Sequence, residues 1–93
     1  MELSEKYPEE YFNHWIAMLS TMNNDLTESG IKEQIENYKN FEGEQEFSEL
    51  QLELKTIIDN GDLNDFVEVA NNHGLEKIQT KDLINMAELI MAE

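Results

Sequence analysis

The sequence contains no cysteine and no arginine, and its 93 residues include one proline and four glycines. Without cysteine the chain has no disulfide framework, no thiolate nucleophile and no zinc–thiolate site. A reducing, cytoplasmic location is the simplest expectation. The first twenty residues have no basic segment and no long apolar run, so we expect neither a signal peptide nor a membrane span.

Positive charge is scarce: the chain has six lysines and 21 aspartates and glutamates, which gives a formal net charge of −15. Nucleic acids and anionic membrane surfaces both bind proteins through clustered cations, so we expect neither as a partner. Apolar residues make up 40% of the chain, which is enough for a modest core. The length fits a single helical domain over residues 1–93.

Apolar residues recur at spacings of three and four, which predicts helices rather than strands. Polar and glycine signals divide the chain into five helical segments. The predicted starts are Pro8, Thr27 or Ser29, and, for the last two helices, Asp62 and Thr80. The predicted ends are Met22 (before the polar run 23–25), Gly43, Gly61 and the turn over residues 72–74.

Each predicted helix carries an apolar stripe that we expect to face a common core. The stripes are Phe12, Trp15, Ile16, Leu19 and Met22; Ile31, Ile35 and Tyr38; Phe47, Leu50, Leu54, Ile57 and Ile58; Leu63, Phe66, Val67 and Ala70; and Leu83, Met86, Ala87, Ile90 and Met91. No repeat or linker marks an internal boundary. The predicted fold is all-α, a single small bundle of four to five helices.

The negative charge is distributed unevenly along the chain. Residues 1–39 have a net charge of −5, residues 40–76 of −9 and residues 77–93 of −1. We therefore expect the strongest acidic field around the middle of the chain, and a last helix that is nearly neutral.

Glutamates cluster on one face of the third predicted helix. Glu46, Glu49 and Glu53 lie three and four residues apart, where each like-charge pair costs about 0.2–0.5 kcal/mol. Such a face is either solvated and screened or bound by a cationic partner. Aromatic and apolar residues beside it are either anchors for that partner or packing residues. The candidate partner-binding residues are Tyr38, Phe41, Glu42, Glu44, Glu46, Glu49, Leu52 and Glu53.

Motifs for catalysis or metal binding are missing. The oxygen-rich stretch from Asp59 to Asn71 fails as a calcium loop, because Ala70 stands where the bidentate carboxylate is needed. The Asp-Ser-Leu motif of acyl carrier proteins does not occur. His14 and His73 are the only histidines, and there is no phosphate loop, nucleophile elbow or metal-binding His–Glu spacing. We expect no enzyme activity, metal, cofactor or small-molecule substrate.

In the C-terminal half, LQLELKTIIDNGDLNDFVEVANNHGLEKIQTKDLINMAELIMA, a helix, a polar turn and a short helix lead to a capped final helix. In this pattern the segment resembles small helical immunity proteins of bacterial polymorphic toxin and contact-dependent growth inhibition systems. The resemblance implies an antitoxin that neutralises one basic toxin domain, expected to be a nuclease, by covering its active site or substrate groove. These families have no catalytic residues to carry over.

Two other functions fit the same composition. An acidic nucleic-acid mimic, of the anti-restriction or anti-CRISPR type, lays carboxylates along the basic groove of a DNA-binding protein. A mimic competes with DNA for its target, whereas an immunity protein binds one cognate toxin. An adaptor bundle that binds a basic helix would show an exposed apolar groove in addition to the acidic face.

Overall fold

The computed structural model describes residues 3–22 and 26–93, and over these residues the chain forms helices and turns without a strand. The elements are α1 (Leu3–Lys6), α2 (Tyr11–Met22), α3 (Glu28–Glu42), α4 (Glu44–Asn60), the 3-10 turn η1 (Leu63–Asp65), α5 (Phe66–Asn72) and α6 (Thr80–Met91). The predicted all-α fold is confirmed. Residues 23–25, predicted as a break, and the side chain of Met22 lie outside the described part.

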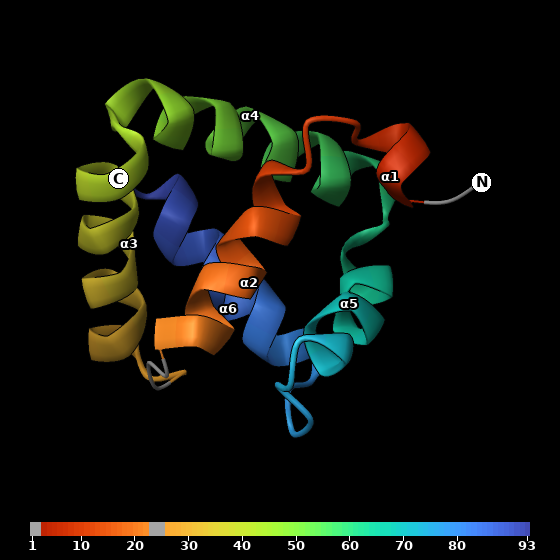
Figure 1. Ribbon diagram of the computed structural model, residues 1–93. Coiled ribbons are helices and arrows are strands. Elements are labelled where there is room, and N and C mark those ends of the chain that lie inside the picture. Colours follow the sequence, from red (N-terminus) through yellow and green to blue (C-terminus); the bar gives the residue numbers. More distant parts are fainter. Residues whose placement is uncertain (1–2, 23–25) are drawn as a thin grey trace.

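The helices surround one apolar core. Figure 1 shows α3 and α4 meeting at a corner, with α2 crossing the centre in front of α6. The predicted stripes supply most of the core, and Trp15 of α2, Leu50 of α4 and Leu83 of α6 are fully buried. Ile58 and Met91 are 46% and 40% exposed, contrary to prediction. Each follows a fully buried stripe residue, Ile57 or Ile90, and lies about 100° farther around its helix, away from the core.

The predicted helix boundaries at Thr27, Gly43 and Gly61 are confirmed, as are the predicted ends at Met22 and in the turn over residues 72–74. The hydroxyl of Thr27 accepts a hydrogen bond from the backbone N–H of Gly30, which caps α3. Gly43 separates α3 from α4 with φ +97°, and Gly61 ends α4 in the left-handed conformation with φ +73°. Glycine adopts both conformations without the steric cost that a Cβ atom adds.

The start of the first predicted helix is wrong. Helix α2 begins at Tyr11 and not at Pro8, because residues 7–10 form a turn in which the N–H of Glu10 bonds the carbonyl of Tyr7. Glu10 has φ +54°, which an α-helix does not accommodate. Helix α1, which the sequence did not predict, precedes this turn.

Asp62 was predicted to cap the fourth helix, but its side chain makes no capping bond and turns toward α1. Its carboxylate accepts hydrogen bonds from the Tyr7 hydroxyl at 2.8 Å and from the Lys6 ammonium at 3.1 and 3.2 Å. These two hydrogen-bond partners lower the pKa of Asp62 below its ordinary value. The contact ties α1 to the turn between α4 and η1.

The cap of α6 is Gln79 and not Thr80. Gln79 and Asp82 form a capping box, in which the backbone N–H of Gln79 bonds the Asp82 carboxylate at 2.8 Å. The Thr80 hydroxyl instead bonds the side chain of Asn64. None of the described helices is long and apolar enough to cross a membrane.

Candidate partner-binding surface

Two shallow pockets lie on either side of the first turn of α2 and share Glu10 and Asn13 as lining residues. Their volumes are about 560 and 470 Å³. We call the two pockets together the acidic basin, because no lysine is among their lining residues. Its seven carboxylates belong to Glu9, Glu10, Glu42, Glu46, Glu53, Asp65 and Glu68.

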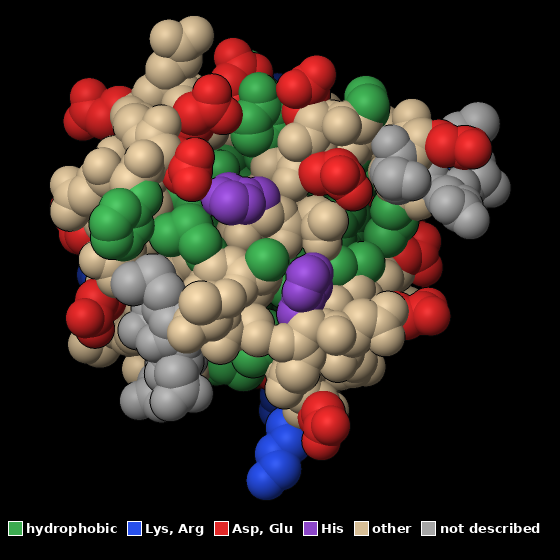
Figure 2. Space-filling model, in the orientation of Figure 1, with side chains coloured by type: hydrophobic (Ala, Val, Ile, Leu, Met, Phe, Trp, Pro, Cys, Tyr) green, Lys and Arg blue, Asp and Glu red, His purple; other side chains and the backbone are tan. Residues whose placement is uncertain are grey.

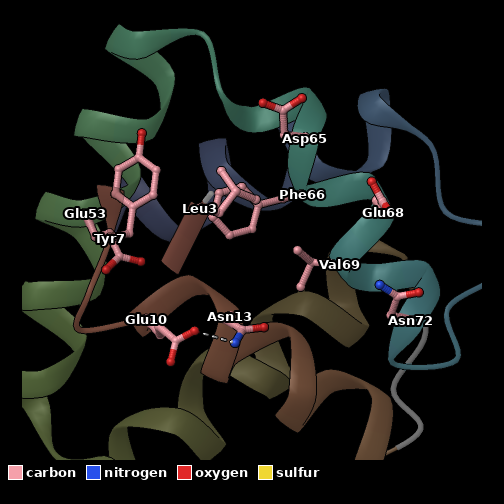
Figure 3. A pocket seen from close by; sticks show the side chains of 10 residues that line it. All are labelled: Leu3, Tyr7, Glu10, Asn13, Glu53, Asp65, Phe66, Glu68, Val69 and Asn72. Atoms are coloured by element: carbon pink, nitrogen blue, oxygen red, sulfur yellow. Dashed lines mark hydrogen bonds between the residues drawn. The ribbon is translucent and has the colours of Figure 1, made fainter. Parts of the chain in front are cut away.

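Segments far apart in the sequence build the basin. Glu9 and Glu10 lie in the turn before α2, and Glu42 lies at the end of α3. The other four carboxylates come from α4, η1 and α5, within the most acidic third of the chain. Figure 3 shows the larger pocket, where carboxylates from these elements surround the apolar side chains of Leu3 and Phe66.

Figure 2 shows the face of the molecule that carries α2. The two histidines lie in the middle of this face, and carboxylates are distributed around them. Lysine surface in this view is small and lies mainly at the lower edge. Negative charge therefore predominates on this face of the molecule.

Glu53 connects α4 to the start of α2. Its carboxylate accepts hydrogen bonds from the backbone N–H of Phe12 at 2.8 Å and of Tyr11 at 3.2 Å. These are two of the N–H groups that a helix start leaves unpaired. Burial raises the pKa of Glu53, although the two hydrogen bonds oppose the shift. Glu53 therefore caps a neighbouring helix and is not a freely solvated member of the predicted glutamate face.

The smaller pocket has a strong negative field. His14 Nε2 of α2 lies 2.9 Å from Glu42 Oε1 of α3. Glu46 of α4 lines the same pocket. Burial raises the pKa of Tyr11, and the nearby charge of Glu46 adds to the shift. Burial also raises the pKa of Tyr38, with Glu42 and Glu46 as additional causes. Both phenol groups therefore resist carrying a further negative charge.

The predicted anchor Tyr38 is a core residue. It is 1% exposed, and its ring packs between Trp15 and Phe47, with ring centroids 5.8 and 6.1 Å apart. Tyr38 lines the smaller pocket of the basin, but with 1% of its surface exposed it offers a partner almost no contact area. The structure confirms the prediction that Tyr38 belongs to the apolar stripe of α3 that faces the core.

Leu52 is 61% exposed, but it lies away from the acidic basin. At 100° per residue it is about 120° around α4 from Glu46. It lines a separate shallow pocket with Lys55 and Met91. The structure therefore places this predicted anchor and Glu46 on different sides of one helix.

Of the remaining predicted residues, none lines the basin. Phe41 is 70% exposed in the last turn of α3. Glu44 is exposed in the first turn of α4, and Glu49 is half-buried. Only Glu42, Glu46 and Glu53 of the predicted glutamates line the basin.

Sequence reasoning missed the basin's contribution from Glu9, Glu10, Asp65 and Glu68. Glu9 and Glu10 precede α2, far along the chain from the glutamate cluster that the spacing revealed. The net charge of residues 40–76 was a signal for Asp65 and Glu68, but spacing along one helix does not reveal residues on another. Among the described residues, no group of three or more acidic or histidine side chains is arranged to hold a metal ion.

No known protein family, curated protein or solved structure matches the chain. The basin's own chemistry therefore carries the functional proposal.

Proposed function

We propose that the chain is an immunity protein that binds one basic toxin domain and neutralises it by covering the toxin's active site or substrate groove. The observation that supports this proposal is the acidic basin, where seven carboxylates converge and lysine is absent from the lining residues. A nuclease needs a cationic cleft to hold phosphates. The basin offers the complementary charge.

The basin combines charge with apolar contact. Leu3 and Val69, which are both half-buried, line the larger pocket between its carboxylates. Charge alone attracts any basic protein, whereas apolar surface of a particular shape favours one partner. Complementary fields also raise association rates by roughly 10- to 1,000-fold, which matters when free toxin is lethal.

In this proposal the chain performs no chemistry of its own. It acts as a stoichiometric inhibitor in the cytoplasm of the cell that makes the toxin, without a cofactor or a small-molecule substrate. The carboxylates of the basin repel one another. A cationic surface that covers the basin offsets this repulsion, so binding also stabilises the folded chain.

The test is affinity capture from a lysate of the source cells with three baits. They are the natural chain, a basin variant with Glu9→Gln, Glu42→Gln and Glu46→Gln, and a control variant with Glu33→Gln, Glu36→Gln and Glu76→Gln. The control changes the same charge at exposed glutamates outside the basin. We expect the natural chain and the control to retain one dominant basic protein through a high-salt wash, and the basin variant to lose it.

The captured protein is then expressed alone and together with the chain. Growth arrest that only co-expression of the natural chain or the control relieves would support immunity. Capture of many DNA-binding proteins, displaced by duplex DNA, would instead indicate a nucleic-acid mimic. Equal capture by all three baits would show that the basin is not the binding surface.

A further inference from the structure

Helix α4 ends at the chain's single Asn-Gly pair, Asn60 and Gly61. In such a pair the backbone nitrogen of the glycine can attack the side-chain amide of the asparagine, because no Cβ atom of the second residue hinders the approach. The Gly61 nitrogen forms a bond with Asn60 Cγ and gives up its proton, and the Cγ–Nδ2 bond breaks to release ammonia. Water then opens the resulting five-membered ring at either carbonyl, which leaves aspartate or isoaspartate. Asn60 is exposed, so water reaches the site.

The native conformation of this turn keeps the reacting groups apart. The N–H of Gly61 is donated to the backbone carbonyls of Ile57 and Ile58, the second at 3.1 Å. Asn60 Nδ2 donates a hydrogen bond to the Tyr7 hydroxyl at 3.2 Å. Asn60 is also the last residue of α4, and ring closure requires a ψ angle that an α-helix does not have. The reaction therefore requires the last turn of α4 to open, which costs less free energy than unfolding the core.

Asn60 belongs to the contact that holds α1 in place. The Tyr7 hydroxyl accepts the hydrogen bond from Asn60 and donates its own hydrogen to Asp62 Oδ2 at 2.8 Å. Because a hydroxyl has one hydrogen, Tyr7 cannot donate to a carboxylate at position 60 while it bonds Asp62. Conversion of the amide to a carboxylate therefore removes the bond to Tyr7. It also places a negative charge at the C-terminal end of α4, where the helix dipole disfavours it.

We propose that Asn60 is a site of spontaneous deamidation, that the last turn of α4 gates the reaction, and that the product loosens α1. Leu3 of α1 and Tyr7 line the larger pocket of the acidic basin (Figure 3), so the modification changes that pocket as the chain ages. The reaction consumes only water and releases ammonia. No partner enters this proposal, so it stands or fails independently of the antitoxin function.

The first test follows the purified full chain at mildly alkaline pH in heavy-oxygen water, with mass spectrometry of its peptides. We expect heavy oxygen to enter at position 60, about ten to a hundred times more slowly in the folded chain than in the chain unfolded in guanidinium, because the turn must first open. In the unfolded chain the rate should rise with pH, because the Gly61 nitrogen must lose its proton before it attacks.

Two variants test whether the last turn of α4 is the gate. Tyr7→Phe removes the hydroxyl that holds the side chain of Asn60, and should speed the reaction in the folded chain about fivefold. Ile35→Val is the matched control, because it lowers the stability of the core by a similar amount at a buried residue of α3. The control should leave the rate nearly unchanged. Urea midpoints of both variants establish that their losses of stability match.

The effect of the product is measured on Asn60→Asp, with Asn71→Asp as the control. Asn71 is exposed in the last turn of α5, so the control adds the same charge at a comparable position of another helix. We expect the backbone N–H of Tyr7, which bonds the carbonyl of Leu3 at 2.8 Å, to exchange with solvent at least about fivefold faster in Asn60→Asp. In Asn71→Asp its exchange should be unchanged.

Three results would overturn the proposal. The first is an intact Asn60 in the folded chain after about a hundred half-times of the reaction in the unfolded chain. The second is equal acceleration by Ile35→Val and Tyr7→Phe, because global unfolding would then be the gate. The third is equal exchange of the Tyr7 N–H in the natural chain and in Asn60→Asp, because the product would then leave α1 in place.

Discussion

At the scale of single residues, Glu53 shows how a side chain far along the sequence can define a helix start. It is one of the predicted partner-binding glutamates, yet its carboxylate holds the first N–H groups of α2. The spacing of Glu46, Glu49 and Glu53 placed them correctly on one helix. It did not reveal that α2 packs against that helix with its unpaired N–H groups toward Glu53.

Replacing Glu53 tests this capping role. Glu53→Ala is expected to lower the free energy of unfolding by about 1–2 kcal/mol, because two backbone donors lose their acceptor. Glu53→Gln keeps only one of the two acceptor oxygens, because Tyr11 and Phe12 bond different oxygens of the carboxylate, and it should cost at least about half of that. Urea denaturation measures both changes. Glu46→Gln, in the same helix but exposed, serves as the control and should be neutral or slightly stabilising; equal losses for Glu53→Ala and Glu46→Gln would contradict the role.

At the scale of elements, the sequence predicts boundaries well where the signal is local. Thr27, Gly43 and Gly61 act within their own turn, so their roles follow from residue type and neighbours. Asp62 has the residue type of a cap, but Lys6 and Tyr7 offer its carboxylate stronger partners from another element. A cap predicted from residue type does not form where a tertiary contact binds the same side-chain atoms more strongly.

The two glycines that flank α4 are expected to respond differently to substitution. Gly61 has φ +73° and ψ 22°, which asparagine adopts readily, whereas Gly43 has φ +97° and ψ 159°, which only glycine adopts readily. A Cβ atom at either position meets no atom within 4 Å, so the cost comes from the backbone alone. Gly61→Asn should lose a few tenths of a kcal/mol, roughly, and Gly43→Asn about 1–3 kcal/mol.

Thermal or urea unfolding of these two variants, with Gly61→Ala beside them, measures the difference. Gly61→Ala should fall between them, at about 1 kcal/mol. Similar losses for Gly61→Asn and Gly43→Asn would show that the conformation at the α3–α4 corner does not require glycine.

At the scale of the whole molecule, the fold gathers seven of the chain's carboxylates around the first turn of α2, where they form the acidic basin. The fold class and most of the core follow from the period of the apolar residues alone. The basin does not, because its carboxylates come from separate segments of the chain: Glu9 and Glu42 line the smaller pocket, and Asp65 lines the larger one. Leu52 and Glu46 are close in sequence, yet the structure separates them onto two surfaces.

The stability of the molecule should be highest at mildly acidic pH. Burial raises the pKa of Glu53 above its ordinary 4.5, so its protonated form favours folding, and stability is lost as the pH rises through the folded-state pKa. The pKa of Asp62 is lowered below 3.8, so its contribution is present above that pH and is lost as the pH falls through the lower value. Reduced repulsion among the other carboxylates adds to stability on the acidic side of neutrality.

Urea midpoints measured from pH 3 to pH 8 test this dependence. We expect a maximum above pH 3.8 and below neutrality, a flatter alkaline limb in Glu53→Gln and a flatter acid limb in Asp62→Asn. A maximum at or above neutral pH would contradict the assigned shifts.

The most direct test of the central claim is the affinity of the purified chain for the basic protein that it captures. Titration calorimetry at about 0.05 M and about 0.3 M salt compares the natural chain with the basin and control triple variants. We expect one chain to bind each copy of the basic protein, equal affinity for the natural chain and the control, and a loss of about tenfold or more for the basin variant, largest at low salt. Equal affinity of all three proteins at low salt would contradict the claim that the acidic basin is the binding surface.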